Sequence, residues 1–399
     1  MKLLRSERWS AALLLTAAVV GLVLANLPVG PALIAVKDEH LDLPWLGLDL
    51  SAGHWISDGL LAIFFFIVSV ELKRELVIGE LNTLSKALLP AIAAVGGVIV
   101  PAAVYLAFTA GSDMVDGWPI PTATDIAFAL GVLAVFGRWL PTRVRVFLLA
   151  LAVLDDLIAI LIIAFFFTSD ANLASIGFAG IAIALFGAVS RMLKPRSAWV
   201  LSRRPQWPIV VVLIVLGVLA WYFVYQSGVH ATIAGVALGL VMSRRPGGRA
   251  AHELEPWSNS VILPLFALTA AMVVVPQVRP TELDPAFWGI LIGLPVGKVV
   301  GIVLVGGLGG LFAQRRASHP IVLGDLLVVG ALGGIGFTVS LLMNELAFDA
   351  MPLVADQGTL GVLLGSGIAI VVSAVLVSIR SRQYRARGER PGTGGAFSH

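Results

Sequence analysis

The sequence predicts an all-α protein that crosses a membrane about twelve times, and composition is the first reason. Of the 399 residues, 58% are hydrophobic and only 13% are charged, and the mean hydropathy is +0.95. An ordinary soluble domain carries about 25% charged residues, so this chain has too few polar residues to cover a soluble fold. The second reason is that the hydrophobic residues form continuous runs of roughly twenty residues, long enough for a helix to cross the hydrocarbon core. Continuous runs exclude a membrane β-barrel, whose strands alternate.

Each helix is expected where such a run lies between charged or Pro- and Gly-rich breaks. In chain order, the expected spans are 9–27, 56–72, 88–109, 118–136, 143–168, 172–190, 206–224, 229–242, 257–275, 287–310, 321–346 and 358–379. They form one membrane domain over residues 1–380, and the basic residues 381–399 are expected to be a disordered cytoplasmic tail. Because there is no cysteine, disulfides, iron–sulfur clusters and cysteine-based zinc sites are excluded. A net charge of only +3 does not indicate a nucleic-acid partner.

The third reason is that the basic residues fall in every second gap between the spans. All 27 Lys and Arg follow this rule except Lys37, Arg279 and Lys298. The intervening gaps are mainly acidic and carry Asp38, Glu39, Asp42, Asp49, Asp113, Asp116, Asp170, Glu282, Asp284, Asp349 and Asp356. By the positive-inside rule, the basic gaps and both termini face the cytoplasm, and the number of spans is even.

A few ionisable residues remain inside the expected spans, namely Asp58, Asp125, Asp155, Asp156, His230, Lys298 and Asp325. A charge at mid-membrane costs roughly 2.5–3.5 kcal/mol on insertion scales, so such residues are candidates for function. Asp125, Asp155 and Lys298 lie near the middle of their spans, which places them at similar depth. Asp58 and Asp325 lie nearer to span ends, where interfacial water can reach them.

Asp155 and Asp156 are adjacent, so on a helix their side chains point about 100° apart. One carboxylate can face a cation while the other faces a wet cavity, and Lys298 is the natural partner because no other cation lies near the middle of a span. Two coupled carboxylates in a medium of low polarity accept either protons or a small hard cation, but not both together. The alternative is a buried ion-pair network that only fixes how the helices pack.

Two of the expected spans contain residues that interrupt a helix. The first reads Pro121-Thr122-Ala123-Thr124-Asp125 and the second Gly333-Gly334-Ile335-Gly336-Phe337-Thr338. Interrupted helices at membrane depth occur where they line a cavity or are buried in protein. Their half-helix ends carry partial charges, positive at N-termini and negative at C-termini, which Asp125 and Lys298 can neutralise respectively.

The interrupted spans hold matching places in two groups of three spans, 88–168 and 287–379. Such pairs are typical of inverted repeats that hold a binding site at their interface. Between the first two spans, residues 43–50 alternate apolar and other residues around Gly47, which predicts a small extracellular β-hairpin. An ordered loop cap is the alternative for that segment.

Several long strings resemble the NhaA family of sodium/proton antiporters, in the family's order and over nearly the whole chain. They are FFFIVSVELKRELVIGEL at Phe64–Leu81, PTATDIAFALGVLA at Pro121–Ala134, LAVLDDLIAI at Leu151–Ile160, SGVHATIAGV at Ser227–Val236 and GGIGFTVSL at Gly333–Leu341. The resemblance implies an electrogenic exchanger in the bacterial cell membrane that imports more protons than the sodium or lithium ions it expels. It implies no cofactor, and a homodimer supported by the hairpin.

The resemblance also implies a role for each candidate residue. Asp156 and Asp155 are then the pair that binds Na+, Li+ or protons, with Lys298 paired to Asp155 and Thr124 and Asp125 at the broken helix. Asp58 corresponds to an acid near the funnel, Glu71 and Arg74 to the charges at the cytoplasmic mouth, and His230 to a histidine linked to the pH response.

The chain departs from the family pattern at the expected pH sensor. A glutamate expected at position 251 is replaced by Ala251, although Glu253 and Glu255 are nearby. The pattern of ion-site residues is complete, so this departure concerns the pH at which the exchanger becomes active.

Two other functions use aspartates inside a membrane. An intramembrane aspartyl protease needs two of them, and Leu323-Gly324-Asp325 is similar to part of that family's motif. Position 322 is however Val, and adjacent carboxylates with a lysine partner do not help two aspartates to share one water. A sodium-coupled symporter of the same fold is the closer alternative, and Lys298 argues against it because an ion pair that titrates suits proton exchange.

Overall fold

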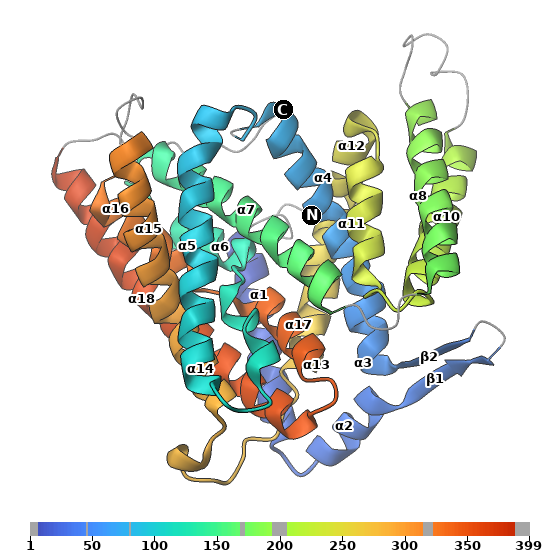
Figure 1. Ribbon diagram of the computed structural model, residues 1–399, viewed down its shortest axis with the longest axis horizontal. Helices are drawn as coiled ribbons and strands as arrows, with labels where there is room; N and C mark the ends of the chain where they lie inside the picture. The colour runs from blue at the N-terminus through green and yellow to red at the C-terminus, as the bar shows by residue number, and fades with distance from the viewer. Residues whose placement is uncertain are drawn as a thin grey trace.

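The computed structural model describes residues 7–44, 47–79, 81–167, 172–193, 206–313 and 322–387, which form a bundle of helices with one small hairpin (Figure 1). The first elements are α1 (Glu7–Ala25), α2 (Gly30–Asp38), β1 (His40–Leu43), β2 (Leu48–Ser51), α3 (Ala52–His54), η3 (Trp55–Leu60), α4 (Leu61–Ile78), α5 (Leu84–Thr109), η4 (Val115–Gly117), η5 (Ile120–Thr122), α6 (Ile126–Phe136), α7 (Thr142–Phe166), α8 (Leu173–Ser190) and η6 (Arg191–Leu193). The remaining elements are α10 (Trp207–Tyr225), α11 (Thr232–Val241), α12 (Arg244–Trp257), η7 (Ser258–Ile262), α13 (Leu263–Ala270), η8 (Pro280–Glu282), α14 (Pro285–Ile292), η9 (Gly293–Gly297), α15 (Lys298–Ala313), α16 (Leu323–Gly333), α17 (Phe337–Ala347) and α18 (Pro352–Ala386).

In the described part of the chain, eight helical segments are long and apolar enough to cross a membrane, or ten if two bent pairs each count as one span. The eight are Ala52–Ile78, Ala87–Thr109, Val115–Phe136, Thr142–Phe166, Leu173–Leu193, Trp207–Tyr225, Pro285–Gly310 and Pro352–Ala386. The bent pairs are α1 with α2, bent by 112°, and α16 with α17, bent by 50°. The chain is therefore an all-α, multi-pass membrane protein.

Two of the expected spans hold helices shorter than a full crossing. The span expected over 229–242 contains α11, with 10 residues, and the one over 257–275 contains α13, with 8 residues. The chain turns just before α11, where Gly228 has a φ of 77°, a left-handed conformation that suits glycine and that a helix does not adopt. By helix length, the described residues thus supply eight to ten crossings rather than twelve.

The helices pack around one large and several smaller hydrophobic clusters. The large cluster joins α1, α5 to α7 and α13 to α18, and a smaller one joins α8, α10 and α11. In Figure 1, α5 lies along α15, α4 along α11 and α8 along α10. On α10, Ile214 and Val218 are 61% and 60% exposed, as suits apolar side chains that contact lipid tails.

Both segments with helix-interrupting residues leave the α conformation at those residues. Before α6 the chain forms the 3₁₀ turns η4 and η5, and Ala123 and Asp125 are extended. The α-helix begins only after Asp125 because Pro119 and Pro121 lack an amide hydrogen for helical bonds. In the other segment α16 ends at Gly333 and α17 begins at Phe337, so the Gly-rich stretch lies between two helices.

The hairpin expected over 43–50 lies between α2 and α3. β1 and β2 pair antiparallel, from His40 opposite Ser51 to Leu43 opposite Leu48, so the first strand starts before residue 43. Two side chains at the C-terminal end of α10 bind the hairpin. The Tyr225 hydroxyl donates to the Asp49 carbonyl (3.3 Å), and Gln226 Nε2 donates to the Gly47 carbonyl (3.1 Å). The hairpin projects from one end of the bundle (Figure 1).

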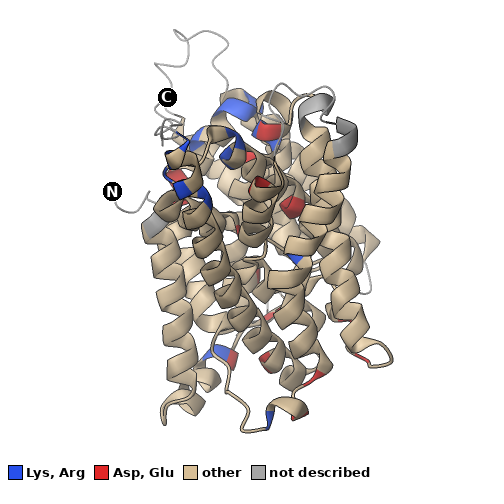
Figure 2. Cartoon of the chain, turned by 90° about the vertical axis from the view of Figure 1, so that its left-hand side faces the viewer, with Lys and Arg blue, Asp and Glu red and all other residues tan. Residues whose placement is uncertain are grey.

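Lys and Arg gather at the upper end of the bundle in Figure 2, and few lie at the lower end. The last turns of α18 contribute to this basic end. Because α18 continues to Ala386, the disordered tail expected from residue 381 is wrong for residues 381–386, which are helical. Ser381 and Tyr384 are buried there, so packing extends the helix. Residues 388–399 lie outside the described part of the chain.

Candidate functional site

The two interrupted segments meet in the middle of the bundle. Asp125 N donates to the Ile335 carbonyl (2.6 Å), and the Thr124 hydroxyl donates to the Gly333 carbonyl (2.7 Å). Thr124 is 1% exposed and Asp125 is 4% exposed, so these bonds form away from solvent. Backbone groups that the breaks leave without helical partners are thereby satisfied by the opposite segment, as membrane depth requires.

Asp125 caps two helices at once. One carboxylate oxygen accepts from Phe128 N (3.1 Å) at the start of α6, and the other accepts from Thr338 N (3.3 Å) and the Thr338 hydroxyl (2.6 Å) at the start of α17. The first turn of a helix carries a partial positive charge, which a carboxylate neutralises. Asp125 thus lies at the N-terminal ends of both α6 and α17. Thr338 was not among the candidate residues, although its place just after the Gly-rich break is where a helix N-terminus needs an acceptor.

Replacing Thr338 with valine is expected to lower the free energy of unfolding by about 1–3 kcal/mol, because a buried carboxyl oxygen loses its hydroxyl donor without a change in side-chain volume. Thermal unfolding in detergent measures the effect. Thr16→Val is the matched control, since the Thr16 hydroxyl is exposed and bonds only to the Ala12 carbonyl one turn away among the described residues. An equal loss in both variants would contradict a capping role for Thr338.

α7 carries both members of the aspartate pair. Asp155 is 2% exposed, and its Oδ2 accepts from Lys298 Nζ at 2.6 Å, while Lys298 itself has no exposed surface. The other oxygen, Oδ1, is buried and has no hydrogen-bond partner among the described residues. Thr124 lies beside Asp155, but its single hydroxyl hydrogen is already used on the Gly333 carbonyl. Asp155 Oδ1 is therefore left as a buried acceptor, with the Thr124 side chain beside it.

Asp156 follows on the same helix and lies within electrostatic range of Asp155, Asp125 and Lys298. It is 9% exposed, which is more than Asp155, and it has no ion pair within the described ranges. The described residues contain no group of three or more His, Asp or Glu that could hold a metal ion. A cation here would have two carboxylates and a hydroxyl as side-chain ligands, a set that suits a small hard ion bound transiently.

Glycines place Lys298 in this buried position. α15 begins at Lys298 and lies so close to α5 that a Cβ on Gly96 would come 2.4 Å from the Gly301 carbonyl oxygen. A Cβ on Gly97 would lie 3.8 Å from Lys298 Cδ. The close contact between α5 and α15 therefore depends on residues without side chains, and it carries the lysine stem to α7.

The other candidates lie in two further places. Asp58, on η3, meets His230, just before α11, with 3.4 Å between His230 Nε2 and Asp58 Oδ1. Trp221 Nε1 also donates to the Asp58 carbonyl (2.8 Å), so this pair connects η3, α10 and α11. Neither residue forms a hydrogen bond or an ion pair with Asp155 or Asp156 in the described ranges.

Glu71 and Arg74 are exposed on the second half of α4, with Glu255 of α12 among the charges nearest to Glu71. Sequence reasoning did not place Glu255 there, because only the packing of α12 on α4 brings it near. Ala251, where a glutamate was expected, is buried on the same helix against Ile67 and Val70 of α4.

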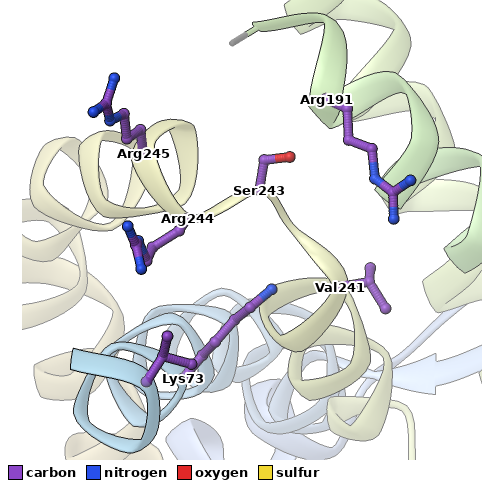
Figure 3. A pocket seen from close by; sticks show the side chains of 7 residues that line it. Lys73, Arg191, Val241, Ser243, Arg244 and Arg245 are labelled. Atoms are coloured by element: carbon purple, nitrogen blue, oxygen red, sulfur yellow. The ribbon is translucent and has the colours of Figure 1, made fainter. Parts of the chain in front are cut away.

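A separate pocket of about 510 Å³ lies between α4, η6 and the start of α12. Figure 3 shows Lys73, Arg191, Arg244 and Arg245 around it, and Lys73 Nζ donates to the carbonyls of Leu240 (2.6 Å) and Met242 (2.8 Å). Four cationic side chains repel a cation, so this pocket is not the site of a transported cation.

Comparisons with known proteins give matches over nearly the whole chain. A family model described as Na+/H+ antiporter 1 matches residues 1–377. The chain is 59% identical over 387 residues to Na(+)/H(+) antiporter NhaA 2 of Clavibacter michiganensis subsp. michiganensis, covering 97% of this chain and 93% of that protein. It is 46% identical to Na(+)/H(+) antiporter NhaA of Tropheryma whipplei (strain Twist) over the full length of both, and 43% identical to Na(+)/H(+) antiporter NhaA 3 of Streptomyces coelicolor, covering 96% and 80%.

Proposed function

The chain belongs to the Na+/H+ antiporter 1 family, and from that membership we propose that Asp155 and Asp156 form the shared site at which it exchanges sodium for protons. Members of this family are sodium/proton antiporters, which are transporters and not enzymes. The transported substrates are therefore Na+ and H+. Nothing in the family assignment indicates a cofactor.

The proposed site rests on one observation: among the described residues, Asp155 has an ion-pair partner, Lys298, and Asp156 has none. Lys298 bonds one oxygen of Asp155, which leaves Asp155 Oδ1 without a partner among the described residues, beside Thr124 and next to Asp156 in the chain. A sodium ion there compensates the negative charge as protons do, so the two ligands exclude each other. Exclusive binding is what couples the two fluxes.

Exchange requires the site to open to each side of the membrane in turn. We expect the interrupted segments at Ala123–Asp125 and Gly334–Gly336 to be two discontinuous spans of inverted repeats, with the ion site where they cross. α11 and the α12–η7–α13 segment would then complete twelve crossings, since short helices can cross together with adjoining turns where protein surrounds them. The two repeats move together relative to the rest of the bundle, and they carry Asp155 and Asp156, which belong to the first repeat and face the second.

The remaining expectations follow from the charge distribution and the family. The basic end of the bundle faces the cytoplasm of a bacterial cell, with both termini inside. Lithium, a smaller ion of the same charge, is a second substrate. The hairpin of β1 and β2 is the contact of a homodimer, and Asp58, His230, Glu71 and Arg74 take part in the entry of ions and the response to pH.

Everted membrane vesicles test the exchange directly. Respiration acidifies the vesicle lumen, and added Na+ or Li+ is expected to release the protons and collapse the pH gradient, whereas K+ is not. In proteoliposomes, exchange of more than one proton per sodium ion is expected to speed up when a K+ diffusion potential favours the net charge movement. A gradient that persists after Na+ addition, at several pH values, would contradict the function, and indifference to the potential would contradict electrogenic exchange.

A further inference from the structure

One fully buried carboxylate at the basic end of the bundle has no part in the ion site described above. Asp325, in the first turn of α16, has no exposed surface. Arg380 Nε of α18 donates to its Oδ1 (2.9 Å), the Tyr384 hydroxyl of α18 donates to its Oδ2 (2.8 Å), and Arg143 Nη2 of α7 lies 3.9 Å from that oxygen. These four residues are called the Asp325 cluster below.

The Tyr384 hydroxyl is the centre of the Asp325 cluster. While it donates to Asp325, it accepts from Arg143 Nη2 (3.0 Å) and Arg380 Nη2 (3.3 Å), so a single oxygen connects three helices. Gly324 makes room for this arrangement, because a Cβ there would come 3.1 Å from Arg380 Cζ. Gly324 and Asp325 resemble part of an aspartyl-protease motif in sequence, but here the glycine makes room for Arg380 and the aspartate pairs with it.

The same turns of α18 also hold the connection between α6 and α7. Trp139 N donates to the Ser381 hydroxyl (3.2 Å), and Arg385 Cζ lies 5.6 Å from the centre of the Trp139 ring. The basic end of α18 therefore fixes the starts of both α7 and α16, which come from different halves of the chain.

Both of those helices run from the cluster to the ion site. Along α16, Asp325 lies about 12 Å from Gly333, whose carbonyl accepts from Thr124, at 1.5 Å of helix rise per residue. Along α7, Arg143 lies about 18 Å from Asp155 by the same rise. Since helices are stiff along their axes, fixing their starts against each other fixes how the Gly333 carbonyl lies relative to Asp155.

We propose that Asp325 is a positioning residue for cation binding, because it locks α16 to α7 and so holds the Gly333–Thr124 contact beside Asp155. The inference rests on the proposed function, since it concerns affinity at the site assigned there. A buried ion pair adds little net stability, because desolvation offsets the attraction of the charges. Its clear effect is to select one packing arrangement, which here is the one that shapes the cation site.

The test compares sodium affinity with maximal rate in proteoliposomes. Asp325→Asn, which keeps the shape but removes the charge, is expected to raise the KM for Na+ about tenfold while the rate at saturating Na+ stays within about twofold. Arg380→Gln is expected to act in the same direction. Arg382→Gln is the matched control, because it removes the same charge from an exposed position two residues further along α18. If Asp325→Asn fails to insert into the membrane, Tyr384→Phe tests the same inference, because it removes only the hydroxyl at the centre of the Asp325 cluster.

A double-variant cycle separates positioning from a merely structural role. If Asp325 acts through the Thr124–Gly333 contact, Asp325→Asn is expected to change the KM less than about twofold once Thr124 is replaced with valine. Variants that lose folded protein but keep the wild-type KM would overturn the inference alone, as would equal shifts from Arg382→Gln. A wild-type protein without sodium-dependent proton flux would overturn the proposed function, and the inference with it.

Discussion

Replacing Asp156 with asparagine is expected to abolish sodium/proton exchange, lowering the rate at least about a hundredfold, while the protein still inserts and folds. Asparagine has the shape of aspartate but can neither release a proton nor carry the negative charge that attracts sodium. Because Asp156 has no ion pair within the described residues, its loss leaves no buried cation without a partner. Folding is also spared because a neutral amide is easier to bury in a membrane than a carboxylate.

Proteoliposomes that report proton flux after sodium addition measure this effect, with the amount of folded protein determined by size-exclusion chromatography. Asp113→Asn is the matched control, since it removes an exposed carboxylate from the loop between α5 and η4. We expect that variant to keep the wild-type rate. Substantial sodium-dependent proton flux from Asp156→Asn would refute the assignment of Asp156 to the ion site.

Lys298→Ala is expected to lower the free energy of unfolding by about 3–5 kcal/mol and to weaken or uncouple exchange. The Lys298 ammonium bonds Asp155 Oδ2 at 2.6 Å in a place without solvent. Removing one partner leaves the other as an uncompensated buried charge, which costs much more than the pair contributed. Parallel measurements of Na+ uptake and proton flux in proteoliposomes show whether the two fluxes remain coupled.

The double variant Asp155→Asn with Lys298→Met is the control for stability. It removes both charges together, so most of the lost stability is expected to return, whereas exchange is not. If Lys298→Ala keeps the stability and the pH profile of the wild type, the ion pair has no role in the exchange mechanism.

Much of the candidate site could be predicted because the membrane makes buried charges rare. Asp125, Asp155 and Lys298 were conspicuous in the sequence since nearly every other charge lies in a loop. The pairing of Lys298 with one of the two adjacent aspartates could also be predicted, because no other cation lies near the middle of a span. Thr338 and the carbonyls of Gly333 and Ile335 could not, since uncharged groups in an apolar segment give no comparable signal.

Helix ends were less predictable than helix positions. α18 passes residue 381 because Ser381 and Tyr384 are buried against partners from α6–α7 and α16, which no local pattern reveals. α11 and α13 are shorter than the hydrophobic runs that contain them, because apolar residues also fill turns when protein rather than water surrounds them.

The sequence by itself determined the class of protein, the approximate place of the helices and the identity of the ionisable residues in the membrane. Those features depend on transfer from water to lipid, which acts on each residue separately. Only the tertiary structure decided which oxygens lie together, that Asp125 caps α6 and α17, and that Asp325 joins α16 to α7 and α18. Most of these contacts join different helices, from 55 to 213 positions apart in the chain, and only packing sets such distances.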